Sequence, residues 1–226
     1  MADERLEKVL SSAAELFIKV GFRKASIAEI SRESGVSIGT IYDYFENKVC
    51  VFYGILAQIA NPDFYSHVTK LPLAQLDFAN LENECTTVMT LFIQNFGAPL
   101  RQRNENYTYE QLLSDAFDSL APFGKGCLLL QANPRICPLV YNGFNKLRVK
   151  MTKLVDGYLR FFQARGVVRP LSRTDVHARF LLESIYWWGS MVHYEEYDPA
   201  NRRIPRGVAK EVCTKALYNA YAVTQV

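Results

Sequence analysis

The chain has 226 residues, of which 49% are hydrophobic and 22% charged, and its formal net charge at pH 7 is +3. This balance is typical of a folded globular protein and excludes a disordered or fibrous chain, while the weak positive charge allows a nucleic-acid partner without requiring one. No apolar run reaches the roughly 18 residues of a membrane span, and the charged N-terminus lacks the apolar segment of a secretory signal. None of the five cysteines forms a Cys-x-x-Cys pair, which favours buried thiols in a reducing compartment. We therefore expect a cytoplasmic protein.

Apolar residues recur with the helical period along nearly the whole chain, and no alternating run indicates a strand. The first part of the chain predicts four helices, at residues 6–20, 27–33, 38–44 and 48–60. The segment 61–79, which contains two prolines, predicts a domain boundary. Further helical patterns follow at residues 81–96, 107–121, 123–137, 139–165, 174–195 and 206–223, and Ser172 is a candidate cap for the helix that begins at 174. The sequence predicts an all-α fold with about nine helices.

Residues 26–45 carry the pattern of a helix-turn-helix. Ser26-Ile27-Ala28-Glu29 is a capping box, in which the serine hydroxyl accepts from the Glu29 amide and the glutamate returns to the cap. Gly35 suits a left-handed turn, and Ser37 is placed to cap the next helix. Two short helices joined in this way form a motif whose second helix enters the major groove of DNA.

The second helix of this motif has two faces. Ile41 and Phe45 lie four residues apart and are predicted to face the core. The positions predicted to face outward are Gly39, Thr40, Tyr42, Asp43 and Tyr44, with Ile38 at the edge. Hydroxyl groups on this face can reach phosphates, and the missing side chain of Gly39 permits a close approach to the DNA backbone. The alternative is an ordinary two-helix corner with its tyrosines wedged into the core.

Cations near the motif give a second indication of DNA binding. Asn47 is predicted to cap the helix 48–60, which places Lys48 in the first turn, where the helix dipole disfavours a cation unless a phosphate docks there. A solvated lysine is the alternative. Arg23 and Lys24 precede the capping box and can add a contact to the DNA backbone. Residues 1–50 hold seven Lys/Arg and eight Asp/Glu, a net charge of −1, so affinity must come from local placement and dimerisation.

The run from Ala13 to Phe52 resembles the DNA-binding domain of TetR-type transcriptional regulators. The resemblance is carried above all by Gly35-Val36-Ser37-x-Gly39-Thr40-Ile41-Tyr42-x-Tyr44-Phe45-x-x-Lys48. It implies that Thr40, Tyr42, Tyr44 and Lys48 contact phosphates or bases and that Ser26 and Ser37 hold the backbone. Asp43 stands where the family often carries a basic or aromatic base reader. It can accept from a cytosine amine or repel phosphate, so base specificity is not carried over.

The resemblance also implies a C-terminal domain that dimerises and binds a small effector. The predicted organisation is a three-helix helix-turn-helix domain at 1–47, a connecting helix at 48–60 and a C-terminal helical bundle at 61–226. Residues 176–194 are apolar almost all round, so their helix needs partners on several sides. One side can pack with residues 206–223 against a second subunit, and the alternative is the central helix of a monomeric bundle.

Aromatic residues are dense in the C-terminal domain and favour a pocket for an apolar or aromatic effector. Arg148, Glu183 and His193 are the candidate polar anchors. The other candidate lining residues are Phe92, Phe96, Phe117, Tyr158, Trp187, Trp188 and Met191. For each aromatic residue, ordinary core packing is the alternative.

Enzyme and metal sites find little support in the sequence. His193 and Glu196 have a helical spacing, but no second pair of ligands accompanies them, and no metal or cofactor is predicted. Nucleophile-elbow, P-loop and dinucleotide-binding motifs are absent from the sequence. Cys127 and Cys137 each lie near a cation and could form a redox switch, although buried structural thiols are the default. The net charge of +6 over residues 101–170 suggests either a second binding surface or the solvated face of a long helix.

The sequence therefore predicts a homodimer that binds a double-stranded DNA operator and represses transcription until a small molecule binds. The helix 48–60 would couple the two domains, because a ligand that favours a displaced position of this helix alters the spacing of the two recognition helices. A DNA-binding scaffold of the same fold that answers to a protein partner remains open, as does a helical enzyme without DNA binding.

Overall fold

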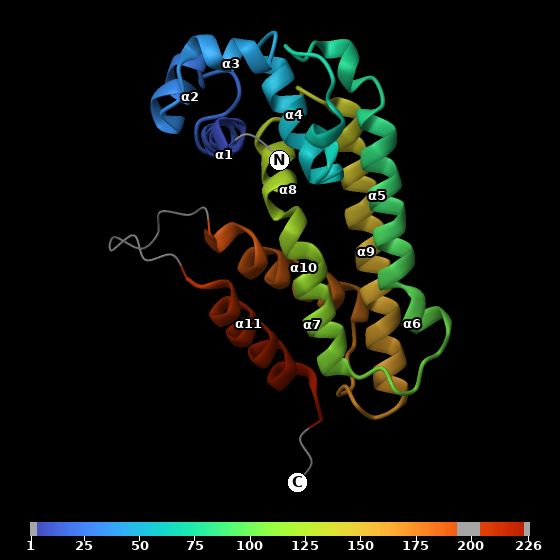
Figure 1. Ribbon diagram of the computed structural model, residues 1–226. Coiled ribbons are helices and arrows are strands. Elements are labelled where there is room, and N and C mark those ends of the chain that lie inside the picture. Colours follow the sequence, from blue (N-terminus) through green and yellow to red (C-terminus); the bar gives the residue numbers. More distant parts are fainter. Residues whose placement is uncertain (1–3, 194–203, 224–226) are drawn as a thin grey trace. The chain divides into compact units, whose positions relative to one another are not determined.

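The computed structural model describes residues 4–193 and 204–223, which are almost entirely helical (Figure 1). Over these residues there is no strand, only two isolated bridges, Phe45 with Leu73 and Val168 with Ala222. The predicted all-α class is confirmed. No described helix is both long enough and apolar enough to cross a membrane. The predicted helix end at 194–195, and the side chains of the pair His193 and Glu196, lie outside the described part.

The chain divides into two compact units. Unit 1 consists of Met1–Met89 and Lys125–Phe144, and unit 2 of Thr90–Gly124 and Asn145–Val226. Unit 1 thus includes more than the predicted helix-turn-helix domain, because segments from the middle of the chain pack with it. The functional division at residues 47 and 60 stays a prediction.

Unit 1 is built around the first four helices. It contains α1 (Glu4–Lys19), α2 (Ile27–Ser34), α3 (Ile38–Tyr44), α4 (Lys48–Ala60), the 3-10 turns η1 (Phe64–His67) and η2 (Gln75–Phe78), the start of α5 (Leu81–Phe96), α8 (Gly124–Ala132) and the start of α9 (Pro138–Ala164). Helix α1 contacts α2, α3 and α4, as Figure 1 shows at the blue end of the chain. Its buried stripe includes Val9, Ala13 and Phe17, and the chain leaves it through Gly21 at a positive φ of 84°.

Unit 2 is a second helical cluster with its own core. It contains the remainder of α5 and α9 together with α6 (Ala98–Arg101), α7 (Tyr109–Leu120), η3 (Ala121–Phe123), α10 (Thr174–Gly189), η4 (Met191–His193) and α11 (Arg206–Tyr221). Helices α7, α10 and α11 contact one another in pairs. Their buried residues include Leu112, Phe117, Leu181, Ile185 and Leu217.

Three predicted helix ends need correction. Helix α8 stops at Ala132 rather than 137, because a residue that precedes proline, here Asn133, is disfavoured in the helical conformation. Helix α10 ends at Gly189, before the predicted 195. Its N-cap is Arg173, which makes no side-chain capping bond, so the prediction that Ser172 caps this helix is wrong.

The free thiols also differ from one expectation. Cys127 and Cys137 are partly buried and form no disulfide, and Cys137 packs against the core of unit 1. Burial raises the pKa of Cys137, so the expected lowering by a nearby cation is not found. A neutral thiol is a weak nucleophile, which favours the structural role over the redox switch.

Candidate nucleic-acid interface

The entry to α2 is fixed by the predicted capping box. The Ser26 hydroxyl accepts from the Glu29 amide at 3.1 Å, and the Ser26 amide donates to Glu29 Oε2 at 2.7 Å. Hydrogen bonds from the Ser26 side chain and backbone lower the pKa of Glu29, so the carboxylate stays ionised as the cap requires. Ser26 therefore holds the backbone of the protein itself at the start of α2.

The turn between α2 and α3 also has the predicted geometry. Gly35 adopts the left-handed conformation with a φ of 69°, and Ser37 caps α3 by accepting from the Thr40 amide at 3.1 Å. The hydroxyl groups of Ser37 and Thr40 are 2.9 Å apart and share a hydrogen bond. These contacts confirm the two short helices of the helix-turn-helix and fix where α3 begins.

Helix α3 presents one buried face and one exposed face. Ile41 and Phe45 are buried, as predicted, but Tyr44 is buried too, with only 8% of its surface exposed. The predicted outward position of Tyr44 is wrong because residues 41, 44 and 45 share one helical face at spacings of three and four. The exposed face consists of Ile38, Gly39, Tyr42 and Asp43, with Thr40 partly exposed at its side. Tyr42 is 47% exposed, which removes the alternative in which this tyrosine is wedged into the core.

Gly39 has no packing reason to lack a side chain. A Cβ at this position would meet only Ser37 Oγ, at 3.8 Å, and the residue is exposed. Its φ is not in the left-handed region that favours glycine. Glycine within a helix costs about 1 kcal/mol relative to alanine. The open space beside Gly39 therefore fits a close approach by a molecule outside the chain.

Lys48 lies in the first turn of α4, where Asn47 caps the helix as predicted. Its ammonium group, however, points into the loop between α1 and α2. It donates to the Phe22 carbonyl at 2.7 Å and the Ala25 carbonyl at 2.6 Å, and it lies 4.4 Å from the centre of the Phe22 ring. Burial lowers the pKa of Lys48. Two of its three donors thus stabilise the loop, and a phosphate contact would have to use the third.

Three further charged residues of the predicted interface are exposed. Arg23 and Lys24 are exposed in the loop that Lys48 holds, directly before the capping box. Asp43 is exposed on the outer face of α3. This placement allows Arg23 and Lys24 to meet phosphates, since solvated cations can exchange their water for DNA oxygens.

Two contacts that position the motif were not found from the sequence. Leu73, in the segment between α4 and α5, donates from its amide to the Tyr44 carbonyl at 2.8 Å and accepts from the Glu46 amide at 3.0 Å. Asn133, which follows α8, donates to the Phe17 carbonyl at 2.9 Å and accepts from the Phe22 amide at 2.6 Å. Both residues are far from the motif in sequence. The pair Asn133-Pro134 was the one signal in the sequence, and it indicates a helix end equally well.

The predicted effector residues all lie in unit 2, where several serve as core. Phe96, Phe117 and Tyr158 are buried in its hydrophobic cluster, while Phe92 and Trp188 pack against it, Trp187 is exposed and Met191 is partly buried. Arg148 and Glu183 form an ion pair with each other at 2.5 Å, and both side chains are more than 40% exposed. These two anchors therefore neutralise each other at the surface.

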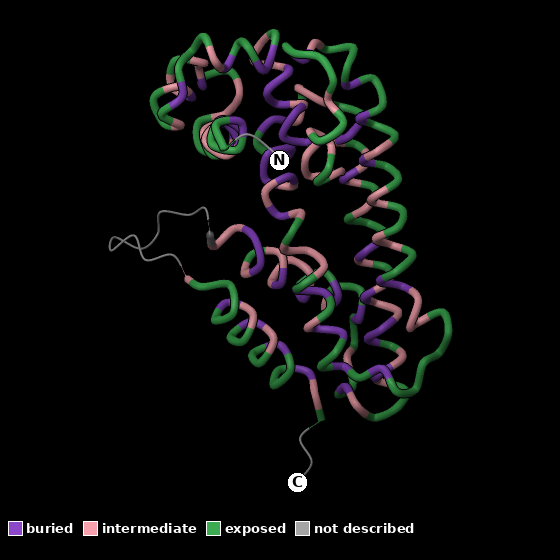
Figure 2. The backbone as a smooth tube through the Cα atoms, in the orientation of Figure 1, coloured by how far each residue is buried: buried purple, intermediate pink, exposed green. Residues whose placement is uncertain are grey.

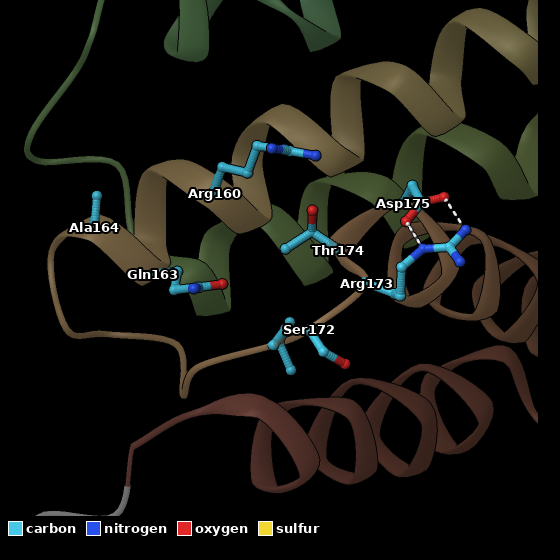
Figure 3. A pocket seen from close by; sticks show the side chains of 8 residues that line it. Arg160, Gln163, Ala164, Ser172, Arg173, Thr174 and Asp175 are labelled. Carbon is cyan, nitrogen blue, oxygen red and sulfur yellow. Dashed lines mark hydrogen bonds and ion pairs between the residues drawn. The ribbon is translucent and has the colours of Figure 1, made fainter.

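An open pocket of about 510 Å³ lies elsewhere in unit 2, at the end of α9 and the start of α10 (Figure 3). Its lining includes Arg160, Gln163, Arg173 and Asp175, and none of the predicted effector residues. Arg173 forms a paired hydrogen bond with Asp175, drawn with dashed lines in Figure 3, and this bond lowers the pKa of Asp175 to about 2. The pocket is not the predicted effector site.

Comparison with known proteins matches the helix-turn-helix region. Residues 9–52 match the family model described as bacterial regulatory proteins, tetR family. The HTH-type transcriptional repressor BepR of Brucella suis biovar 1 (strain 1330) is 30% identical over 95 residues, which are 40% of this chain and 44% of that protein. The HTH-type transcriptional regulator HbdR of Aromatoleum sp. (strain CIB) is 34% identical over 59 residues, 26% of each chain. The matches thus span about a quarter to a half of the length of these curated relatives.

The solved structures extend the likeness to the whole fold. The ketosteroid transcriptional regulator KstR2 of Mycobacterium tuberculosis superimposes with a TM-score of 0.52 at 14% sequence identity, covering 99% of this chain and 97% of that one. The curated relatives are named as regulators of transcription, in agreement with the prediction that the chain is not an enzyme. Residues 9–52 are therefore similar to the DNA-binding domain of the TetR family, and the helical fold of the described residues is similar to that of KstR2.

Proposed function

We propose that this chain acts as a homodimer that binds a specific DNA operator and represses transcription until a small molecule releases it. The observation that carries the proposal is the exposed face of α3, formed by Ile38, Gly39, Tyr42 and Asp43. Helix α3 has seven residues, and two of them, Ile38 and Tyr42, are large apolar or aromatic residues that are nearly half exposed. Their exposure to water is unfavourable, whereas the same side chains could make contacts in a DNA groove. A cytoplasmic location fits this function.

In the proposed complex, the exposed face of α3 enters the major groove. The Tyr42 hydroxyl is free to meet a phosphate or a base edge, and Gly39 lets the helix approach the backbone closely. Arg23 and Lys24 supply cations at the edge of the motif, and the third donor of Lys48 can add to them. Asp43 is the candidate for reading a cytosine amine, since a carboxylate accepts from that group.

The proposed dimer uses α10 and α11, which contact each other in unit 2. Both helices leave apolar side chains exposed on the side away from the core. These are Val176, Phe180 and Trp187 on α10, and Val208 and Val212 on α11, at helical spacings of four and seven. Figure 2 shows exposed positions alternating with buried ones along α11. Pairing these two helices with the same helices of a second copy would bury both stripes in one bundle.

The proposed effector site lies in unit 2, close to Ser190. Its hydroxyl group is enclosed and makes no hydrogen bond within the described part of the chain. Buried hydroxyls in proteins are nearly always hydrogen-bonded, so this one suits the polar group of a ligand. The preceding Gly189 lies against the ring of Phe117, one of the predicted lining residues. Displacement of α4 by the ligand would then change the spacing of the two α3 helices and lower operator affinity.

The test is to select DNA fragments that the purified protein binds from its source genome, and to footprint the most enriched one. The proposal predicts a short footprint with two-fold symmetry, whose half-sites lie about one helical turn apart. Sedimentation of Phe180→Glu should show monomers, while the matched change Leu91→Glu, at an exposed leucine of α5, should leave the dimer intact. Absence of any enriched fragment at low salt would refute the DNA-binding function.

A further inference from the structure

The loop between α1 and α2 is held from two sides at a single residue. The Phe22 amide donates to Asn133 Oδ1 at 2.6 Å, and the Phe22 carbonyl accepts from Lys48 Nζ at 2.7 Å. The Phe22 ring packs on Phe17 and Phe52, with ring centres 5.2 and 5.8 Å away. Phe22 is therefore the point at which segments of α1, α4 and the end of α8 meet. The loop leads directly into α2, the first helix of the motif.

The buried side chain of Asn133 makes three hydrogen bonds. It is 6% exposed, and its Nδ2 donates to the carbonyls of Phe17 and Leu129, each at 2.9 Å. Phe17 and Phe22 precede it by 116 and 111 residues. A buried amide that loses such partners leaves unsatisfied groups behind, so each of the three contacts is costly to break. These hydrogen bonds thereby hold the end of α8 and the α1–α2 loop in a fixed position relative to each other.

We infer that Asn133 is a positioning residue, which transmits the position of α8 to the DNA-reading helices through Phe22. The inference rests on the proposed function and gives it a second coupling route beside α4. Helix α8 starts at Gly124, where an added Cβ would clash with Ser190, and it ends one residue before Asn133. A ligand that shifts the start of α8 would move the residue that holds the entry to α2. Because the side chain of Asn133 is buried, this role needs no contact between Asn133 and DNA.

The experiment compares Asn133→Ala with two matched controls. The first control, Asn142→Ala, removes an exposed asparagine side chain of α9. The second, Leu130→Ala, truncates a buried side chain of α8 that cannot form a hydrogen bond with the α1–α2 loop. The readouts are hydrogen exchange at the Phe22 amide, affinity for the selected DNA fragment, and the unfolding midpoint. Asn133→Asp keeps the size of the side chain and the acceptor for Phe22, so it stays measurable if the alanine variant unfolds.

The inference predicts that Asn133→Ala speeds exchange at the Phe22 amide and weakens DNA binding, each by about tenfold or more. Asn133→Asp should weaken DNA binding with less effect on the Phe22 amide. Leu130→Ala should lower the unfolding midpoint while its folded form binds DNA within about twofold of the unchanged protein. Equal DNA affinity of Asn133→Ala and the unchanged protein would overturn the inference alone. Failure of the unchanged protein to bind DNA would instead refute the proposed function. DNA binding by the unchanged protein is measured first, so the two outcomes are distinguishable.

Discussion

Tyr42 and Tyr44 form a matched pair for testing which face of α3 meets DNA. The two tyrosines are two residues apart on the same helix, but Tyr42 is 47% exposed and Tyr44 is 8% exposed. Removing the buried ring in Tyr44→Ala should cost about 3–5 kcal/mol of unfolding free energy, as for other large aromatic side chains in cores. Tyr42→Ala should change the unfolding free energy by less than about 1 kcal/mol, since its ring is half solvated.

The effects on DNA binding should run in the opposite order. If each Tyr42 hydroxyl makes one hydrogen bond to DNA, its loss costs about 1–1.5 kcal/mol per subunit. A dimer loses two such bonds, about 2–3 kcal/mol together, so the dissociation constant should rise about 30- to 140-fold. Urea unfolding followed by circular dichroism gives the first quantity, and fluorescence anisotropy with the selected fragment gives the second. The reasoning is refuted if Tyr42→Ala destabilises the fold as much as Tyr44→Ala does, or if it binds DNA normally.

Three further predictions follow from single residues. Gly39→Ala should raise the unfolding free energy by up to about 1 kcal/mol through helix propensity, yet weaken DNA binding in the same anisotropy assay. Leu73→Ala should lower the unfolding free energy by about 2–5 kcal/mol, whereas Leu71→Ala should have little effect, because Leu73 is 3% and Leu71 48% exposed; equal urea midpoints would contradict this. Burial raises the pKa of Cys85 to about 12 from 9.0, so the folded state holds this proton more tightly than the unfolded state. Its contribution is complete below pH 9 and is lost as the pH rises towards 12, and the stability difference between the unchanged protein and Cys85→Ala should shrink over that range.

Local sequence signals predicted the helix-turn-helix well. Ser26, Gly35 and Ser37 cap helices through contacts with residues at most three positions away in the sequence. Such short-range capping patterns can be recognised without a structure. The exposure of Tyr42 followed from the same helical period. The outward placement of Tyr44 failed because the period was anchored on Ile41 and Phe45 alone, although position 44 lies on their side of a 3.6-residue turn.

Long-range contacts could not be predicted in the same way. Lys48 donates to two backbone carbonyl groups that lie 23 and 26 residues earlier in the chain. The hydrogen-bond partners of Leu73 and Asn133 are likewise brought close by tertiary packing. Backbone carbonyls carry no sequence signal, because every residue has one. For the effector site, aromatic residues were an ambiguous guide, since Phe117 and Tyr158 serve the core of unit 2 as fully buried rings.

The central claim is that the exposed face of α3 lies in the major groove of DNA. The most direct measurement attaches an iron chelate to Asp43→Cys, on that face, and maps where it cleaves the selected fragment. The control attaches the same chelate to Glu15→Cys, at an exposed position of α1, and labelled unchanged protein reports any reaction at the native thiols. We predict two clusters of cleavage, one in each half-site and about one helical turn apart, from position 43 only. Bound DNA that is left uncleaved by the position-43 chelate, or cleaved alike from both positions, would contradict the account.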